Sequence, residues 1–83
     1  MQDLQDIVSA EYKGQYRILI TFEDGKSGIV DFSQLLSFRG IFEPIKSIDA
    51  FKNFYIDKEL GTIAWPNGAD FAPDTLYHII SNS

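Results

Sequence analysis

A strict alternation of apolar and polar side chains before an Asp-Gly pair restricts the fold of this chain more than any other feature. The apolar face of the first run consists of Tyr16, Ile18, Ile20 and Phe22. A period of two residues predicts a β-strand with one buried face, here from Gln15 to Glu23. Asp24-Gly25 then precedes a second run, from Lys26 to Phe32. The pair tolerates positive φ, which predicts a hairpin with a primed turn.

Two further segments extend the predicted β-structure. Leu4 to Tyr12 is rich in strand-forming residues and precedes the break at Lys13-Gly14. It therefore adds a first strand, which makes a three-stranded antiparallel meander. Asn53 to Asp57 alternates in the same way, and Lys58 to Gly61 turns the chain toward Thr62–Trp65. These segments predict a second hairpin.

The remaining segments predict short helices and a helix at the C-terminal end. Capping residues and apolar spacing predict helical turns from Ser33 to Phe38 and after Ser47, separated by a loop from Ile41 to Ser47. Phe42 and Ile45 in this loop are the expected core anchors. The last helix is predicted from Pro73 to about Ile80, because proline suits a first helical turn. Its inward stripe consists of Leu76, Ile79 and Ile80. The predicted architecture is α+β, with residues 1–83 as a single domain.

Charge and composition exclude several classes of function. The net charge of −5 and the seven scattered Lys and Arg residues argue against direct nucleic-acid binding. There is no cysteine for a disulfide or a thiolate metal site, and no apolar run long enough for a membrane span. The acidic start does not resemble a secretory signal, so the cytoplasm is the expected compartment. Seven Phe, four Tyr and one Trp exceed what a small core can hide, which favours a partner surface or a homodimer.

The sequence offers little material for catalysis. The chain has a single His, no Cys and no glycine-rich phosphate loop, so we expect neither enzymatic activity nor a cofactor. Asp70, Asp74 and His78 are the best cluster of titratable residues. Asp74 and His78 are four positions apart on the last predicted helix and so share a face. Two carboxylates and an imidazole could hold a divalent metal, but Pro73 places Asp70 outside the helix. Surface ion pairing is the favoured interpretation, and no metal site is predicted.

The loop between the last predicted strand and the last helix is the strongest candidate for a binding site. Pro66 ends the strand because it lacks an N–H, and Asn67-Gly68 allows a tight reversal. Ala72 is a poor N-cap, so the Asp70 side chain is expected to supply the missing acceptor. The candidate binding residues are Trp65, Asn67, Asp70, Asp74 and Tyr77. Capping and loop stabilisation are the simpler roles for the two aspartates.

These residues also carry a resemblance to a known family. Trp65-Pro66-Asn67-Gly68-Ala69-Asp70, followed by Pro73-Asp74-x-Leu76-Tyr77, resembles the hallmark of the bacterial domain of unknown function 2442 family. The segments Tyr16–Phe22 with Asp24-Gly25, Val30–Ser33 and Phe42–Ile45 agree with it, so the resemblance covers nearly the whole chain. It implies a small α+β fold with an antiparallel sheet and no established activity.

The resemblance also suggests a biological setting. Some members resemble this domain fused to a helix-turn-helix domain, and others look like one half of two-gene pairs proposed as toxin–antitoxin modules. The residues after Tyr77 are too few for a helix-turn-helix, so DNA binding by that route is not expected here.

The sequence supports three hypotheses for the function of the chain. The preferred one is a protein-interaction module, antitoxin-like or regulatory, that binds a basic partner protein or a second copy of itself. The alternative is a sensor of a small ligand or a divalent metal with its site at the Asn67–Asp74 loop. In the third, the loop is purely structural.

Overall fold

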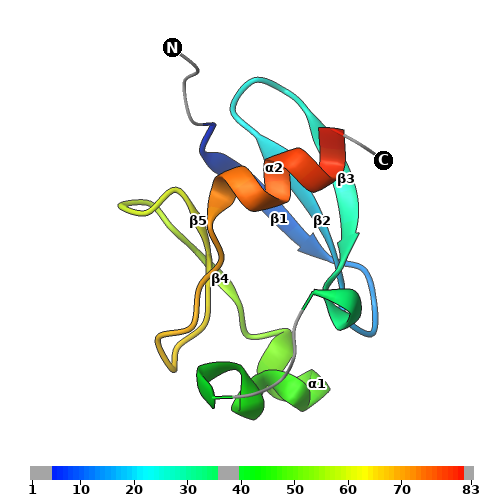
Figure 1. The fold of residues 1–83 in the computed structure, drawn as a ribbon, viewed down its shortest axis with the longest axis vertical. Coiled ribbons are helices and arrows are strands. Elements are labelled where there is room, and N and C mark those ends of the chain that lie inside the picture. Colours follow the sequence, from blue (N-terminus) through cyan, green and yellow to red (C-terminus); the bar gives the residue numbers. More distant parts are fainter. Residues whose placement is uncertain (1–4, 36–39, 82–83) are drawn as a thin grey trace.

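The structure, a computed structural model, describes residues 5–35 and 40–81. Its strands form a three-stranded antiparallel sheet in the order β1-β2-β3 and a two-stranded sheet of β4 and β5 (Figure 1). The strands are β1 (Ile7–Tyr12), β2 (Arg17–Phe22), β3 (Ser27–Asp31), β4 (Tyr55–Asp57) and β5 (Thr62–Ala64). The start of the first predicted strand, Leu4, lies outside the described residues. The predicted meander and second hairpin are confirmed.

In the described parts of the chain, four helical segments complete the fold, which confirms the predicted α+β class. They are the 3₁₀ helices η1 (Phe32–Gln34) and η2 (Gly40–Lys46) and the α-helices α1 (Ile48–Phe51) and α2 (Pro73–Ser81). A helical turn was predicted from Ser33 to Phe38. Its last residues, including Phe38, lie outside the described residues. Within the described ranges, the helices are too short or too polar to cross a membrane.

The predicted loop from Ile41 to Ser47 is wrong, because η2 occupies most of it. A 3₁₀ helix tolerates Pro44 in a short stretch and brings side chains three positions apart into line. Phe42 and Ile45 have this spacing; Ile45 is buried and Phe42 partly so, which confirms both as core anchors. Ser47 does precede α1, but its side chain makes no capping hydrogen bond, contrary to the prediction.

The core lies between the inner face of the three-stranded sheet, α2 and the β4–β5 hairpin. Trp65, Phe32 and Phe51 form its aromatic centre, and the Trp65 ring centroid lies 6.2 Å from that of Phe32 and 5.8 Å from that of Phe51. The helix α2 crosses the inner face of the sheet (Figure 1). A Cβ atom at Gly28 would lie only 3.0 Å from the Ile80 side chain, so the glycine lets α2 approach β3 closely.

The turn between β2 and β3 differs from its prediction. Gly25 N–H donates to Phe22 C=O (2.9 Å), and Phe22 N–H donates to Lys26 C=O (2.8 Å). Among the described residues, Gln15 is the non-glycine residue with positive φ, so Asp24 keeps a negative φ while Gly25 adopts +91°. This is a three-residue loop that ends in a glycine bulge, not the predicted two-residue primed turn.

Candidate functional site

The segment from Trp65 to Ala69 reverses the chain directly after β5. Gly68 N–H donates to Trp65 C=O (2.9 Å), and Trp65 N–H donates to Ala69 C=O (2.8 Å). Pro66 supplies the fixed φ that suits the second position of such a turn, and Gly68 adopts a φ of +95°. The predicted tight reversal at Asn67-Gly68 is therefore confirmed.

Asn67 fastens this turn to the helix η2. Its Oδ1 accepts a hydrogen bond from Ala69 N–H (3.2 Å), and its Nδ2 donates to Ile41 C=O (2.7 Å). The second bond joins residues 26 positions apart. Because an amide can donate and accept at once, one side chain both closes the turn and fixes its position against η2.

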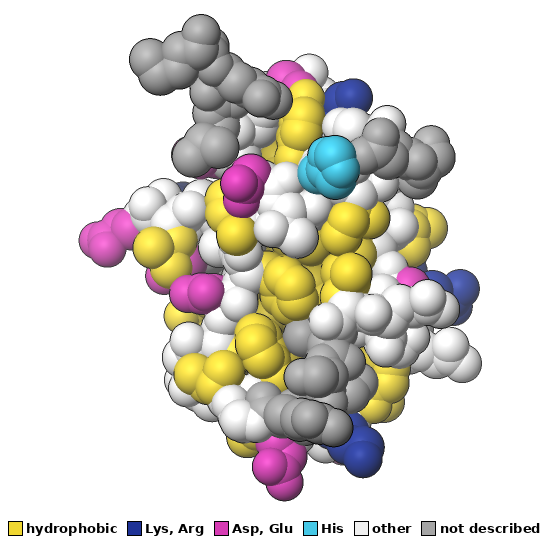
Figure 2. All heavy atoms as spheres, in the orientation of Figure 1, with side chains coloured by type: hydrophobic (Ala, Val, Ile, Leu, Met, Phe, Trp, Pro, Cys, Tyr) yellow, Lys and Arg dark blue, Asp and Glu magenta, His cyan; other side chains and the backbone are white. Residues whose placement is uncertain are grey.

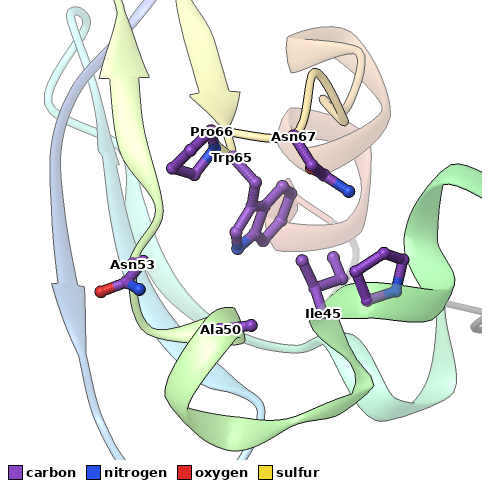
Figure 3. Close-up of a pocket in the computed structure, with 7 residues that line it drawn as sticks. Ile45, Ala50, Asn53, Trp65, Pro66 and Asn67 are labelled. Carbon is purple, nitrogen blue, oxygen red and sulfur yellow. The ribbon is translucent and has the colours of Figure 1, made fainter.

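Trp65 is fully buried, so its indole is not an exposed platform for a ligand. Its Nε1–H donates to Phe51 C=O (2.7 Å), which satisfies the polar atom of the ring at the end of α1. Figure 3 shows the indole reaching from the end of β5 toward α1 and Ile45. The side chain therefore holds the β4–β5 hairpin against the two helical segments.

A surface hollow of about 160 Å³ lies next to this indole. Its lining residues are Pro44, Ile45, Ala50, Asn53, Trp65, Pro66 and Asn67 (Figure 3). The walls are mainly apolar, and the amides of Asn53 and Asn67 provide polar groups. Charged residues of both signs adjoin the lining residues in the sequence, and Lys52 Nζ lies 3.8 Å from Asp49 Oδ1. The apolar walls with two amide groups suit an apolar group.

Five of the lining residues were not among the predicted binding residues. Pro44 and Ile45 belong to a segment that carries the family resemblance, which was an available signal. Ala50 and Asn53 carry no signal in the sequence, because only the packing of α1 against β5 brings them to the hollow.

The predicted residues Asp70 and Asp74 lie elsewhere. Asp70 is exposed, and its backbone forms an isolated bridge with Ala64. Asp74 is also exposed, and its Oδ1 accepts from Thr75 N–H (3.0 Å) in the first turn of α2. Within the described ranges, the start of α2 donates no hydrogen bond to the Asp70 side chain, so the predicted cap is wrong. Asp74 replaces it, because a carboxylate inside the first turn lies closer to the free N–H groups.

Residues 5–35 and 40–81 contain no group of three or more His, Asp or Glu side chains that could hold a metal ion. Asp70, Asp74 and His78 therefore do not converge as a ligand set.

Tyr77 occupies a different place, at the β2–β3 turn. Its ring packs edge-on against Phe22, with centroids 4.9 Å apart, and its hydroxyl donates to Asp24 Oδ2 (2.5 Å). Lys26 Nζ lies 5.4 Å from the centroid of the same ring. Of the five predicted residues, the structure brings only Trp65 and Asn67 to the hollow.

This contact shifts the pKa values of both partners. The Tyr77 hydroxyl, followed by the Lys26 backbone N–H, lowers the pKa of Asp24 below 3.8. The same hydrogen bond to the carboxylate raises the pKa of Tyr77 above 10.0. Both shifts favour the state in which Tyr77 donates and Asp24 is ionised.

The surface charge follows the net charge of the chain. Figure 2 shows acidic side chains over the β4–β5 side of the molecule and apolar side chains gathered in the middle of the face, below α2. The fold and the hollow define a small α+β protein built on a three-stranded meander and the β4–β5 hairpin. The model of the family described as "Protein of unknown function (DUF2442)" matches residues 7–82, so the chain belongs to this family. Searches of curated proteins and of solved structures gave no match.

Proposed function

We propose that this chain is a protein-interaction module that binds an apolar side chain of a basic partner protein in the hollow beside Trp65. The observation that carries the proposal is the apolar hollow itself, walled by Pro44, Ile45, Ala50 and Pro66. A volume of about 160 Å³ suits a single large side chain rather than a cofactor. The chain thus provides an anchor pocket, the type of feature around which interfaces concentrate their binding energy.

Charge supports the choice of a basic partner. The chain has a net charge of −5, with twelve Asp and Glu residues against seven Lys and Arg. Opposite charge on the partner would speed its association, and salt would weaken the attraction. We propose the regulatory, antitoxin-like half of a bacterial two-gene pair, in the cytoplasm, as the setting for such a module. The proposal includes no catalytic step.

The test is to fill the hollow and compare what the chain captures. Ala50→Leu places a larger side chain in the wall of the hollow, whereas Ala72→Leu makes the same change at an exposed position before α2. Tagged wild-type and variant chains are incubated with lysate of the native host at low and high salt, and bound proteins are identified by mass spectrometry. We expect a basic protein that wild type and Ala72→Leu retain at low salt, and that Ala50→Leu loses.

Two results would contradict this function. One is capture of the same proteins by all three chains, which would place binding outside the hollow. The other is capture that does not change with salt, which would remove the electrostatic part. The sensor alternative has less support, because Asp70 and Asp74 do not line the hollow. A rise in melting temperature on adding Mg²⁺, Mn²⁺ or Zn²⁺ to the purified chain would favour it instead.

A further inference from the structure

The strand β3 ends the three-stranded sheet with one side open. It pairs only with β2 among the described residues, and it lies at the outer edge of the sheet in Figure 1. Its register with β2 runs from Thr21 opposite Ser27 to Arg17 opposite Asp31 without a shift. An unpaired edge of this kind presents backbone N–H and C=O groups to any strand that reaches it.

The register shows which backbone groups face outward. Phe22 N–H donates to Lys26 C=O at one end of the hairpin, and Phe32 N–H donates to Tyr16 C=O at the other. Hydrogen-bonded pairs alternate with non-bonded pairs in an antiparallel ladder. The groups that point away from β2 therefore belong to Ser27, Ile29 and Asp31. These three alternate residues define what we call the β3 edge.

Within its five residues, β3 lacks three of the features that protect natural edges. Proteins blunt exposed strands with lysine, proline or a bulge. β3 contains no lysine and no proline, and from Ser27 to Asp31 its pairing with β2 shows no bulge. The opposite outer strand, β1, does have an irregular register between Ile7 and Ser9, and its first N–H donates to Gly61 C=O. The two outer strands therefore differ, since β1 has an irregular register and a hydrogen bond to Gly61, whereas the register of β3 is regular.

We propose that the β3 edge pairs with the β3 edge of a second copy of this chain, around a twofold axis at Ile29. In that register, Ile29 N–H donates to Ile29 C=O of the second copy, and Asp31 N–H donates to its Ser27 C=O. The side chains are compatible, because Ser27 lies opposite Asp31 and no two like charges face each other.

The side chains at the axis add an apolar contact. Ile29 is 57% exposed, and it lies opposite Leu19 on the face of the sheet that α2 does not cover. Pairing two copies joins the Leu19 and Ile29 side chains of both into one apolar stripe. An edge of five residues buries less area than a permanent dimer requires, so the association is weak and depends on concentration.

The twofold axis at Ile29 permits a charge-exchange experiment. Ile29→Lys and Ile29→Glu each place like charges directly opposite each other, whereas a mixture of the two variants places opposite charges there. Sedimentation velocity over a range of concentrations measures association of wild type, each variant and the mixture. The matched control is Leu60→Lys, since Leu60 is 52% exposed in the turn between β4 and β5. Far-UV circular dichroism checks that each variant is folded.

We expect dimers of wild type and Leu60→Lys, monomers of each Ile29 variant alone, and dimers again in the mixture. Salt should strengthen wild-type association, because it screens repulsion between two chains of net charge −5. Monomeric wild type at all concentrations, or dimers of Ile29→Lys alone, would overturn the proposal. Failure of the mixture to associate would exclude the axis at Ile29.

This inference stands apart from the partner site. The Ile29 variants leave the hollow unchanged, and salt acts in opposite directions on the two associations. Either proposal can therefore fail without the other.

Discussion

The β2–β3 turn and the turn after β5 have the same backbone geometry but different attachments. Each begins at a buried aromatic residue, Phe22 or Trp65, and ends in a glycine with a φ of +91° or +95°. In each, the residue before the glycine uses Oδ1 to accept the N–H two positions later. The comparison shows that one local structure can serve two long-range roles.

The two turns differ in the second polar side-chain atom of their third residue, which is Asp24 in one turn and Asn67 in the other. Asp24 uses its second oxygen to accept from the Tyr77 hydroxyl on α2, whereas Asn67 uses its amide nitrogen to donate to Ile41 C=O in η2. A carboxylate can only accept, and an amide can do both. The chemical identity of this one residue therefore decides which element each turn can hold.

The largest expected difference between the turns concerns their first residues. Trp65→Phe removes buried volume and leaves Phe51 C=O without its donor, so we expect the free energy of unfolding to fall by about 2–4 kcal/mol. Phe22→Leu removes only packing atoms and should cost about 1–2 kcal/mol. Urea denaturation measures both, and equal losses would show that the indole hydrogen bond adds little.

The glycines should behave alike. An alanine at either position must adopt positive φ, which costs about 1–2 kcal/mol. A Cβ at Gly25 would meet no atom within 4 Å, and one at Gly68 would lie 3.7 Å from the Ile41 side chain, an ordinary contact. We therefore expect equal destabilisation of Gly25→Ala and Gly68→Ala in thermal and urea unfolding. A much larger effect at one site would show that the two turns are not equivalent.

Exchanging the third residues should have unequal effects. Asn67→Asp replaces a donor with a carboxylate facing Ile41 C=O, and we expect a loss of about 1–2 kcal/mol. Asp24→Asn keeps one oxygen for Lys26 N–H, and its amide can donate to the Tyr77 hydroxyl oxygen instead, so it should have a smaller effect. Paired urea titrations of the two variants test this order. The reverse order would show that the amide donor of Asn67 is not what holds the turn to η2.

The smallest expected effect is a pH dependence confined to the β2–β3 turn. The lowered pKa of Asp24 means that its contribution is present above pH 3.8 and is lost as the pH falls through the lower folded value. The raised pKa of Tyr77 means that its contribution is present below pH 10.0 and is lost as the pH rises through the higher folded value. The stability difference between wild type and Tyr77→Phe should therefore vanish at both extremes of pH.

Asn67→Ala is the control for this measurement. The hydrogen bonds of Asn67 involve no titratable group, so its stability difference from wild type should stay constant over the same range. A parallel decline in both variants would point to general acid and alkaline unfolding.

Local patterns predicted most of the fold. Alternation fixed the strands around Ile18 and Ile20, and Pro73 marked the first residue of α2. The type of the β2–β3 turn was not predictable in the same way, because Asp24-Gly25 fits a two-residue turn and a glycine bulge equally well. Loop length depends on the pairing register, which the whole sheet determines.

The candidate site was predicted only in part, for a related reason. Trp65 and Asn67 belong to a recognisable loop, but the other walls of the hollow come from η2 and α1. The placement of Tyr77 depends on a hydrogen bond between residues 53 positions apart. Sequence patterns relate only residues that are close along the chain. For this reason Tyr77 was grouped with the preceding loop, although it contacts the β2–β3 turn.

The distance along the chain between Tyr77 and Asp24 also bears on the order of folding. Each hairpin turn closes locally, which takes microseconds. The helix α2 has only nine residues, too few to be stable in isolation. We therefore expect it to form as it docks on the sheet, with Ile80 next to Gly28. If its contacts form late, substitutions in α2 should speed unfolding more than they slow refolding, which stopped-flow kinetics in urea would measure.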